Sequence, residues 1–205
     1  MPPSRHSIAW LKEEPFGVEH ADVSLSANRL AATGVAIGSA PAPYRLDYRL
    51  LTRRGFVTSR LRVSTRGDGW RRELDLRRSP AGIWSATTLS EGLGTHAPPR
   101  IDLDSLEGAL DCDLGLSPMT NTMPVLRYGL LTAGEASCRV AWVSVPDLGV
   151  EAVDQSYSYV RTEADGTSIV RFEDENGFTA DITFDADGFV VFYPALARRL
   201  EAAPS

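Results

Sequence analysis

Alternation of apolar and polar residues runs through most of the 205-residue chain and constrains its fold more than any other feature. Between Tyr44 and Leu50, tyrosines and leucines alternate with arginines and an aspartate. A period of two places the apolar side chains on one face of a β-strand and the polar side chains on the other, so each such segment predicts a strand. Similar segments follow at residues 57–63, 73–77, 82–89, 109–116, 125–132, 137–145, 155–161, 168–173, 178–184 and 188–193.

Glycine-containing turn signals separate many of these segments. Glycine and asparagine supply the positive φ angles that tight hairpin turns need. Only the tail at residues 195–203 and a short turn at residues 104–107 have helix-like sequences. We therefore predict a mainly β protein with a single strongly curved antiparallel sheet, a spiral or half-barrel, and a short C-terminal helix. The turn signals lie at residues 66–69, 79–82, 164–166, 175–177 and 185–188.

The length of the chain suits one domain that spans residues 1–205, with a core at about residues 10–200. A chain of 22.3 kDa can bury about 70% of its unfolded surface in one core. Since little helix is available to cover so large a sheet, the sheet must curl, close or fold on itself. The sequence leaves open whether the interior holds a ligand cavity or is filled by its own side chains.

The charge balance and the N-terminal sequence limit the classes of partner and location. The chain carries 21 basic and 27 acidic residues, for a net charge of −6, so we expect no nucleic-acid partner. Lys12 is the only lysine, and arginine binds planar anions in a bidentate manner that lysine cannot match. The first residues lack the pattern of a signal peptide, and no apolar run approaches the roughly 20 residues of a membrane span. We predict a cytoplasmic protein without a transmembrane segment.

The residues that usually mark an enzyme or a metal site are missing from the sequence. Cys112 and Cys138 lie in strand-like segments and are expected to be buried and reduced. The three histidines lie far from both cysteines along the chain, which disfavours a zinc site. The sequence contains neither a Gly-x-Ser-x-Gly motif nor a phosphate-binding loop. We predict no catalytic residue, no cofactor and no metal.

The segment from residue 106 to residue 127 departs from the simple strand pattern. Alternation places Asp111 and Asp113 on one face of a strand, where two carboxylates need compensating donors or water. Arg127 and Asn121 are among the nearest candidate donors. Three interpretations stay open: solvated or loop-capping carboxylates, carboxylates that accept ligand hydroxyls while Arg127 pairs with them or with a ligand anion, or a divalent-cation site. Two carboxylates alone are too few ligands for calcium.

The same segment resembles a known family. Asp-Cys-Asp-Leu, followed by Ser-Pro-Met-Thr-Asn-Thr-Met-Pro-Val-Leu-Arg, is similar to the hallmark of the bacterial putative glycolipid-binding family, formerly a domain of unknown function. The resemblance implies a fold similar to that of lipoprotein-localisation carriers, whose curved sheet encloses an apolar cavity, and it implies no catalytic residue. This chain has one arginine, Arg127, where two are common, and Leu51 where a tryptophan often stands before the threonine. Weaker matches lie at residues 51–53, 83–84, 145–148, 155–157 and 187–194.

We therefore predict a binding protein that holds a lipid or glycolipid-like amphiphile in a β-sheet cavity with a polar mouth. About 12 buried methylenes would contribute up to about 10 kcal/mol before the cost of association. The alternatives are a carbohydrate- or ester-processing hydrolase that uses Asp111 and Asp113, or a protein-interaction scaffold. Protein partners are not predicted. The predicted ligand-binding residues are Asp111, Asp113, Asn121, Arg127, Gln155, Tyr157, Tyr193 and Arg53.

Overall fold

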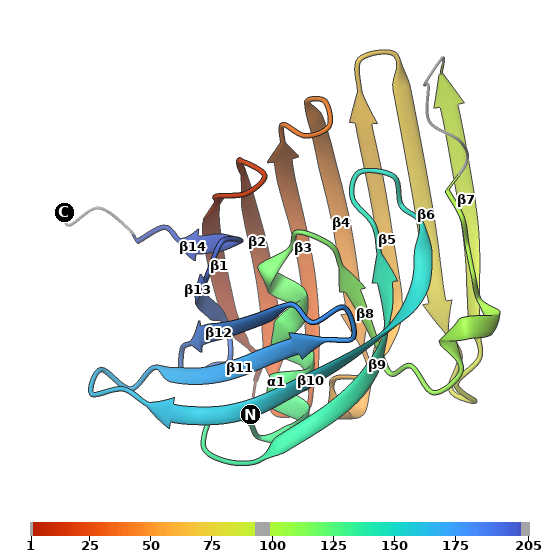
Figure 1. The fold of residues 1–205 in the computed structure, drawn as a ribbon. Coiled ribbons are helices and arrows are strands. Elements are labelled where there is room, and N and C mark those ends of the chain that lie inside the picture. The colour runs from red at the N-terminus through yellow and green to blue at the C-terminus, as the bar shows by residue number, and fades with distance from the viewer. Residues whose placement is uncertain (1, 93–98, 202–205) are drawn as a thin grey trace.

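A computed structural model describes residues 2–92 and 99–201 and contains one open sheet of 14 strands within them (Figure 1). The first seven strands, called the N-terminal half, are β1 (Ser4–Lys12), β2 (Gly17–Ser26), β3 (Arg29–Gly38), β4 (Tyr44–Thr52), β5 (Thr58–Gly67), β6 (Trp70–Arg78) and β7 (Trp84–Gly92). The C-terminal half comprises β8 (Asp111–Leu114), β9 (Glu135–Val143), β10 (Val150–Thr162), β11 (Ser168–Asp174), β12 (Thr179–Phe184), β13 (Val190–Tyr193) and β14 (Ala197–Arg199).

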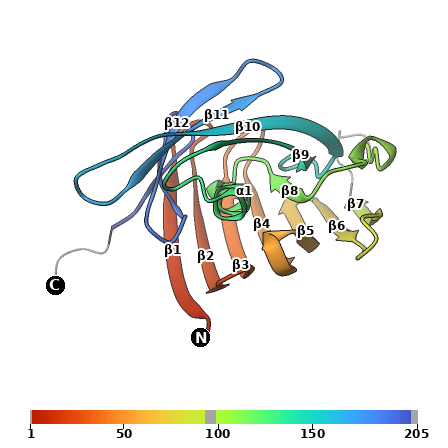
Figure 2. The ribbon, with the colours of Figure 1, turned by 90° about the horizontal axis from the view of Figure 1, so that it is seen from below.

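The strands follow the chain order within each half, and the two halves join where β1 pairs with β14. Trp10 is completely buried at this junction, and its indole Nε1 donates a hydrogen bond to the carbonyl oxygen of Val190 at 2.9 Å. The sheet bends over on itself, so that the two halves form two layers (Figure 2). The mainly β fold with a single curved, unclosed sheet is therefore confirmed.

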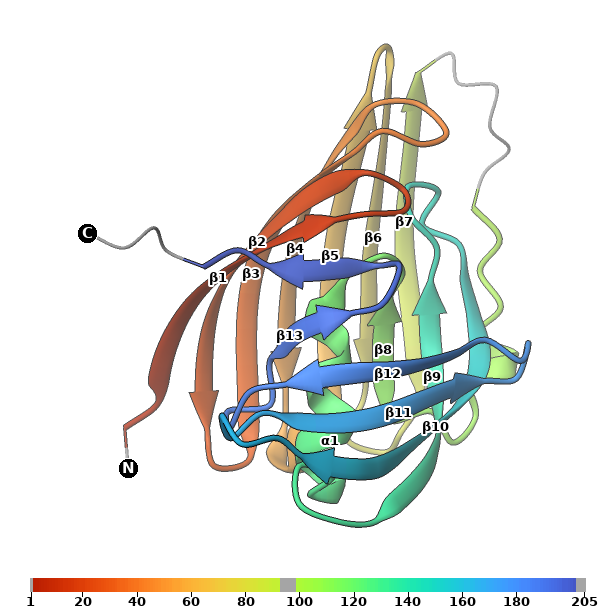
Figure 3. The ribbon, with the colours of Figure 1, turned by 60° about the vertical axis from the view of Figure 1, so that its left-hand side comes forward.

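The space between the layers holds a short helical segment, and β8, the edge strand of the C-terminal half, lies beside it (Figure 3). This segment consists of the 3₁₀ helix η3 (Pro118–Asn121) and the α-helix α1 (Thr122–Tyr128). Two other 3₁₀ turns, η1 (Arg54–Phe56) and η2 (Asp104–Leu106), lie in connections, and η2 matches the predicted turn at residues 104–107. Buried side chains of the N-terminal half share one apolar cluster with those of β8 and η3, whereas Val125 and Leu130 join the inner face of the C-terminal half.

The strand predicted at residues 125–132 is wrong, because a helix begins just before it. Ser117 accepts a hydrogen bond from the backbone N–H of Met119, and Pro118 occupies the first turn, where its missing N–H costs nothing. Gly129, at φ 67°, ends α1 in the left-handed conformation that glycine adopts readily. The buried apolar residues of this segment, Val125 and Leu130, therefore lie in a helix and in the turn after it rather than on one face of a strand.

The C-terminal helix is also wrong. Ala195 has a φ of 63°, and residues 197–199 form β14, which pairs with both β1 and β13. Ala197 is completely buried at this central position of the sheet. Pairing on both edges outweighs the helix propensity of an Ala- and Arg-rich tail. Residues 202 and 203 of that prediction lie outside the described part of the chain.

The sheet is mixed rather than purely antiparallel, because β8 runs parallel to β9. Asp111 lies opposite Val140 and Leu114 lies opposite Val143 in this pairing. The helical segment and the loop after it return the chain to the start of β9, which gives the long crossover that a parallel pair needs. No helix within residues 2–92 and 99–201 is long and apolar enough to cross a membrane.

Candidate functional site

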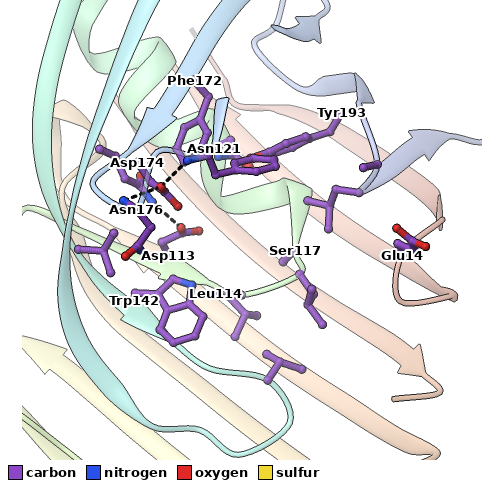
Figure 4. Close-up of a pocket in the computed structure, with 18 of the residues that line it drawn as sticks. Glu14, Asp113, Leu114, Ser117, Asn121, Trp142, Phe172, Asp174, Asn176 and Tyr193 are labelled. Carbon is purple, nitrogen blue, oxygen red and sulfur yellow. Dashed lines mark hydrogen bonds between the residues drawn. The ribbon is translucent and has the colours of Figure 1, made fainter. Parts of the chain in front are cut away.

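A cavity of about 510 Å³ lies between the β8–η3 segment and the inner face of the C-terminal half (Figure 4). Its polar residues gather at one end, around Asp113, Asn121 and Asp174, and Glu14 lies at the other end. Small-molecule sites usually enclose about 300–1,000 Å³ and combine apolar walls with a few polar groups. Apolar and aromatic side chains form its walls: Leu114, Leu116, Trp142, Val145, Val153, Phe172, Phe178, Tyr193 and Leu196.

The strand β8 positions the polar end of the cavity. Its alternation turns the Cys112 side chain toward the N-terminal half, where Cys112 Sγ accepts from Thr58 Oγ1 at 3.5 Å. Asp113 therefore points the other way, toward β10. After β8 the chain turns sharply at Leu116, which has a φ of 63°, and this turn brings Ser117 and η3 back over the cavity.

A hydrogen-bond network fixes the side chains at the polar end. Asp113 accepts bonds from Thr120 Oγ1 and Gln155 Nε2, each at 2.7 Å. Gln155 Oε1 in turn accepts from the Tyr157 hydroxyl at 3.2 Å, and that hydroxyl accepts from Asn121 Nδ2 at 3.0 Å. Burial raises the pKa of Asp113, and the bonds from Thr120 and Gln155 oppose that shift. The network therefore presents a firmly held carboxylate to the cavity.

Three aromatic rings form part of the wall beside this end. The ring centroids of Phe172, Phe178 and Tyr193 lie 6.1 to 6.4 Å apart, within the range of favourable aromatic contact. Tyr157 packs edge-on against Phe172 from behind, at 5.2 Å. Phe178 is 46% exposed, so this wall reaches the molecular surface. Burial raises the pKa of the Tyr193 hydroxyl, and the charge of Asp113 adds to the effect.

Among the described residues, the charged side chains that line the cavity are all acidic. Glu14, Asp113, Glu151 and Asp174 line it, and no lysine, arginine or histidine does so among the described residues. Asp174 Oδ1 accepts from the backbone N–H groups of Asn176 and Phe178, which leaves its second oxygen outside these bonds. An anionic ligand group would meet like charge here, whereas hydroxyl groups would find hydrogen-bond acceptors.

Asp111, the second carboxylate of β8, has a different environment. It is buried, and both of its oxygens pair with the guanidinium of Arg127, whose Nε donates to the carbonyl oxygen of Gly55 at 2.7 Å. Burial raises the pKa of Asp111, and Arg127 opposes that shift. The pair ties β8 to α1 and η1, and neither residue lines the cavity.

A second buried ion pair lies on the inner side of β1 and β2, where it contacts Ser117 of the cavity lining. Lys12 Nζ lies 3.4 Å from Glu19 Oε2, and both side chains are almost fully buried. Glu19 Oε1 accepts from Ser117 Oγ at 2.6 Å and from the Tyr48 hydroxyl at 3.0 Å. Ser117 lines the cavity, so this pair anchors the turn that closes it.

The structure divides the eight predicted ligand-binding residues into three groups. Asp113, Asn121, Gln155 and Tyr193 line one cavity, although they come from four different parts of the chain. Tyr157 lies behind them and holds Asn121 and Gln155 in place. Asp111 and Arg127 bind each other, and Arg53 is not among the lining residues.

Sequence reasoning missed most of the cavity wall. Trp142, Phe172, Phe178 and Asp174 line the cavity and are not among the predicted ligand-binding residues. One signal was available, because Val153 and Glu151 share the face of Gln155 in the same alternating strand. The contribution of β11 and of the turn after it depends on how the halves fold over, which no local pattern records.

The structure shows no evidence of a metal centre in its described residues. No group of three His, Cys, Asp or Glu side chains within residues 2–92 and 99–201 is placed to hold a metal ion. Cys112 and Cys138 are buried and free of disulfides, as predicted, and burial raises the pKa of each thiol to about 12. Both thiols are therefore protonated and unreactive at neutral pH.

These features define a class of mainly β proteins in which an open sheet folds over a central helical segment and leaves a pocket beside it. The family model described as "Putative glycolipid-binding" matches residues 7–199, so the chain belongs to this family. A crystal structure of a DUF1089-family protein from Pseudomonas aeruginosa is similar, with a TM-score of 0.65 and 26% sequence identity over 89% of this chain and 92% of that chain. None of the curated proteins matches the sequence.

Proposed function

We propose that the protein binds a small amphiphile with an uncharged, hydroxyl-bearing head group of the sugar type. The observation that carries this proposal is the two-part lining of the 510 Å³ cavity, which has a fixed polar end and an apolar, aromatic wall. The apolar chain would lie along Leu114, Trp142 and Val153, and the head group would meet Asp113 and Asn121.

The hydrogen-bonding capacity of the polar end supports a hydroxyl-bearing head group. A carboxylate can accept about four hydrogen bonds, and Asp113 accepts two from the protein. The Asn121 amide has a second N–H beyond the one that it donates to Tyr157. The aromatic wall at Phe178 and Tyr193 offers a surface against which a sugar ring can pack.

The charge of the lining supports an uncharged head group over a phosphate or carboxylate. Four carboxylates line the cavity, and no described basic side chain does. The positions of the two β8 carboxylates also favour binding over glycoside hydrolysis. Hydrolysis needs two carboxyl groups that flank one bond, whereas Asp111 is sequestered by Arg127 outside the cavity.

Calorimetric titration with three matched probes tests this function. The probes are decyl glucoside, decanoate and glucose, each below any micelle-forming concentration. The nine methylenes and the methyl group of the decyl chain contribute about 8 kcal/mol, and hydrogen bonds to the head group add about 1–2 kcal/mol. Association costs of at least about 4 kcal/mol reduce this sum, so we expect decyl glucoside to bind with a Kd on the order of 100 µM. Decanoate should bind at least about tenfold more weakly because of the carboxylates, and glucose should show no measurable binding. Equal binding of decanoate and decyl glucoside would contradict the proposed head group.

Two tryptophan substitutions provide a matched control for the location. Val153→Trp fills the cavity from β10, whereas Ser137→Trp adds the same ring to the exposed outer face of β9. We expect the first variant to lose decyl glucoside binding and the second to retain it. If neither wild type nor Ser137→Trp binds any of the three probes, the proposed function is wrong.

The head group can be tested separately with Asp113→Asn. This change keeps the shape of the side chain and removes the charge that Thr120 and Gln155 stabilise. We expect about tenfold weaker binding of decyl glucoside and tighter binding of decanoate, since repulsion falls. An unchanged preference between the two probes would show that Asp113 does not contact the head group.

A further inference from the structure

The outer face of β4, β5 and β6 carries a dense array of arginines that the cavity does not use. Inward residues of these strands are buried, so their neighbours in sequence point to solvent. Figure 2 shows α1 and the C-terminal half against the opposite, inner face. We call this array the arginine face, and it consists of Arg45, Arg49, Arg60, Arg62, Arg66, Arg71 and Arg77.

The strand register places these arginines directly opposite one another. Arg66 pairs with Arg45 on one side and with Arg71 on the other, and Arg49 pairs with Arg62. Like charges directly opposite each other destabilise a sheet. Stability of the fold therefore does not explain this arrangement, which suits the binding of a polyanionic surface.

The carboxylates on this face neutralise only part of its charge. Asp75 alone contacts three guanidiniums, those of Arg60, Arg62 and Arg77, and bonds from Arg60 and Arg77 hold its pKa well below the usual range. Within the described residues, Arg49 and Arg66 form no ion pair. Asp47 and Glu73 are the other two acidic residues on the outer side of β4–β6, so seven guanidiniums face three carboxylates.

Arg71, Arg66 and Arg45 lie side by side across β6, β5 and β4. Exposed apolar side chains continue this row onto β3 and β2. Ile37 lies beside Arg45 in the register and Val18 lies beside Ile37, and they are 54% and 39% exposed. Phe16, in the turn before β2, is 64% exposed. The same turn carries Glu14, which lines the cavity. Cationic and apolar groups thus border the segment that leads to the proposed binding site.

We infer that the arginine face and its apolar border dock the protein on an anionic lipid bilayer. This inference rests on the proposed function, since a protein that binds an amphiphile must exchange it with a membrane. Guanidinium groups bind lipid phosphates in a bidentate manner, and Phe16 and Ile37 can enter the interfacial region. A nucleic acid is the less suitable polyanion, because none of the outward residues of β4–β6 is an aromatic that could stack on a base.

Vesicle co-sedimentation tests the inference with two triple variants that change the charge equally. Arg49→Gln, Arg62→Gln and Arg66→Gln remove three arginines from the arginine face. Arg139→Gln, Arg161→Gln and Arg171→Gln remove three exposed arginines from the C-terminal half. The vesicles are pure phosphatidylcholine or a mixture of phosphatidylcholine and phosphatidylglycerol at low salt.

We expect wild type and the C-terminal triple variant to bind the anionic vesicles and not the neutral ones. Each arginine near an anionic surface contributes about fivefold in affinity, so the arginine-face variant should bind about 100-fold more weakly. Added salt should weaken the binding of wild type. Circular dichroism of each variant checks that the fold is retained.

Three results would overturn the inference: no binding of wild type to anionic vesicles, equal losses in the two triple variants, or tighter binding to duplex DNA that the arginine-face substitutions abolish. Decyl glucoside titration of the same samples separates the two proposals. Intact glucoside binding without vesicle binding would overturn only the membrane inference, whereas vesicle binding without glucoside binding would overturn only the proposed cargo.

Discussion

The two halves of the sheet share one sequence pattern but use their inner faces differently. In the N-terminal half, Leu61 and Leu76 are completely buried in one cluster with Met119 and Met123 of the helical segment. In the C-terminal half the same segment covers only part of the inner face, and the rest lines the cavity. Strand alternation therefore specifies which residues face inward, and the position of residues 118–128 determines whether those residues pack or line a pocket.

The outer faces differ as well. In the C-terminal half the described arginines on the outer face of β9 and β11 lie beside aspartates on neighbouring strands, as in Arg139 with Asp154 and Arg171 with Asp181. In the N-terminal half Arg49 lies opposite Arg62 instead. Balanced cross-strand pairs contribute to sheet stability, whereas opposed arginines do not. The N-terminal half thus has a filled interior and an excess of positive charge on its outer face. The C-terminal half has a cavity inside, and the arginines of β9 and β11 are paired with aspartates outside.

The largest expected effect comes from the buried ion pair at the start of β8. Arg127→Met leaves the Asp111 carboxylate buried without its partner, which should lower the free energy of unfolding by about 3–5 kcal/mol. Arg139→Gln breaks an exposed pair on the outer face and should cost far less. Urea denaturation measures both variants. Similar losses of unfolding free energy in the two variants would show that the buried pair contributes no more to stability than the exposed pair.

A matched pair of valine substitutions tests whether one half is filled and the other is not. Val63, on the inner face of β5, is buried, whereas Val153 lines the cavity and is partly exposed. Val63→Ala should cost about 2 kcal/mol because a void opens in close-packed surroundings. Val153→Ala should cost less than about 1 kcal/mol, since its methyl groups already border empty space. Equal costs in thermal or urea unfolding would argue against the cavity.

The dependence of stability on pH should have opposite signs for an interior and an exterior carboxylate. Burial raises the folded-state pKa of Asp113 above its usual value of 3.8, so its contribution to stability falls as pH rises above about 4. The bond from Arg139 lowers the pKa of Asp154, whose contribution is present above about pH 4 and is lost as pH falls below it.

Urea unfolding of Asp113→Asn and Asp154→Asn between pH 3 and pH 7 tests this difference. Relative to wild type, Asp113→Asn should gain stability as pH rises, and Asp154→Asn should lose it. If the stability of each variant relative to wild type did not vary with pH, this would contradict the raised pKa of Asp113 and the lowered pKa of Asp154.

The smallest expected effect concerns the opposed arginines. The triple change of Arg49, Arg62 and Arg66 to Gln should leave the melting temperature within about 2 °C of wild type or raise it, because like-charge repulsion is removed. The triple change of Arg139, Arg161 and Arg171 should lower it, because each loses an ion pair. Differential scanning calorimetry at low salt compares the two. A large loss only in the first variant would give the arginine face a structural role.

Local patterns were sufficient for the strands that alternate strictly and end in glycine turns. Residues 44–50 and the turn at residues 66–69 are predicted correctly because alternation and turn residues are local signals, and the backbone of β4 pairs with adjacent hairpin strands. The three strands before residue 44 were not predicted, and α1 and β14 were predicted as the wrong element. Their conformations depend on distant partners: α1 fills the space between the halves, and β14 pairs with β1 across most of the chain.

The candidate site was only partly predictable for the same reason. The motif around Asp113 and Asn121 marks the polar end of the cavity, because its residues are close in sequence. Arg127 was named as a candidate donor to the two carboxylates, but the spacing of the motif could not show that Arg127 binds Asp111 and leaves Asp113 free of it. The aromatic wall at Phe172 and Phe178 comes from β11 and the turn after it, and only the folded sheet brings it to Asp113.

Proton NMR of the four tryptophan indoles tests the central claim most directly. Trp142 lines the cavity, whereas Trp10, Trp70 and Trp84 lie in or against the apolar cluster of the N-terminal half. The variant Trp142→Phe assigns the Trp142 signal by its absence. During titration with decyl glucoside, the Trp142 indole signal should shift and saturate while the other three stay in place. A shift of the other indoles without a shift of Trp142, or no shift at all, would contradict the proposal that this cavity binds an amphiphile.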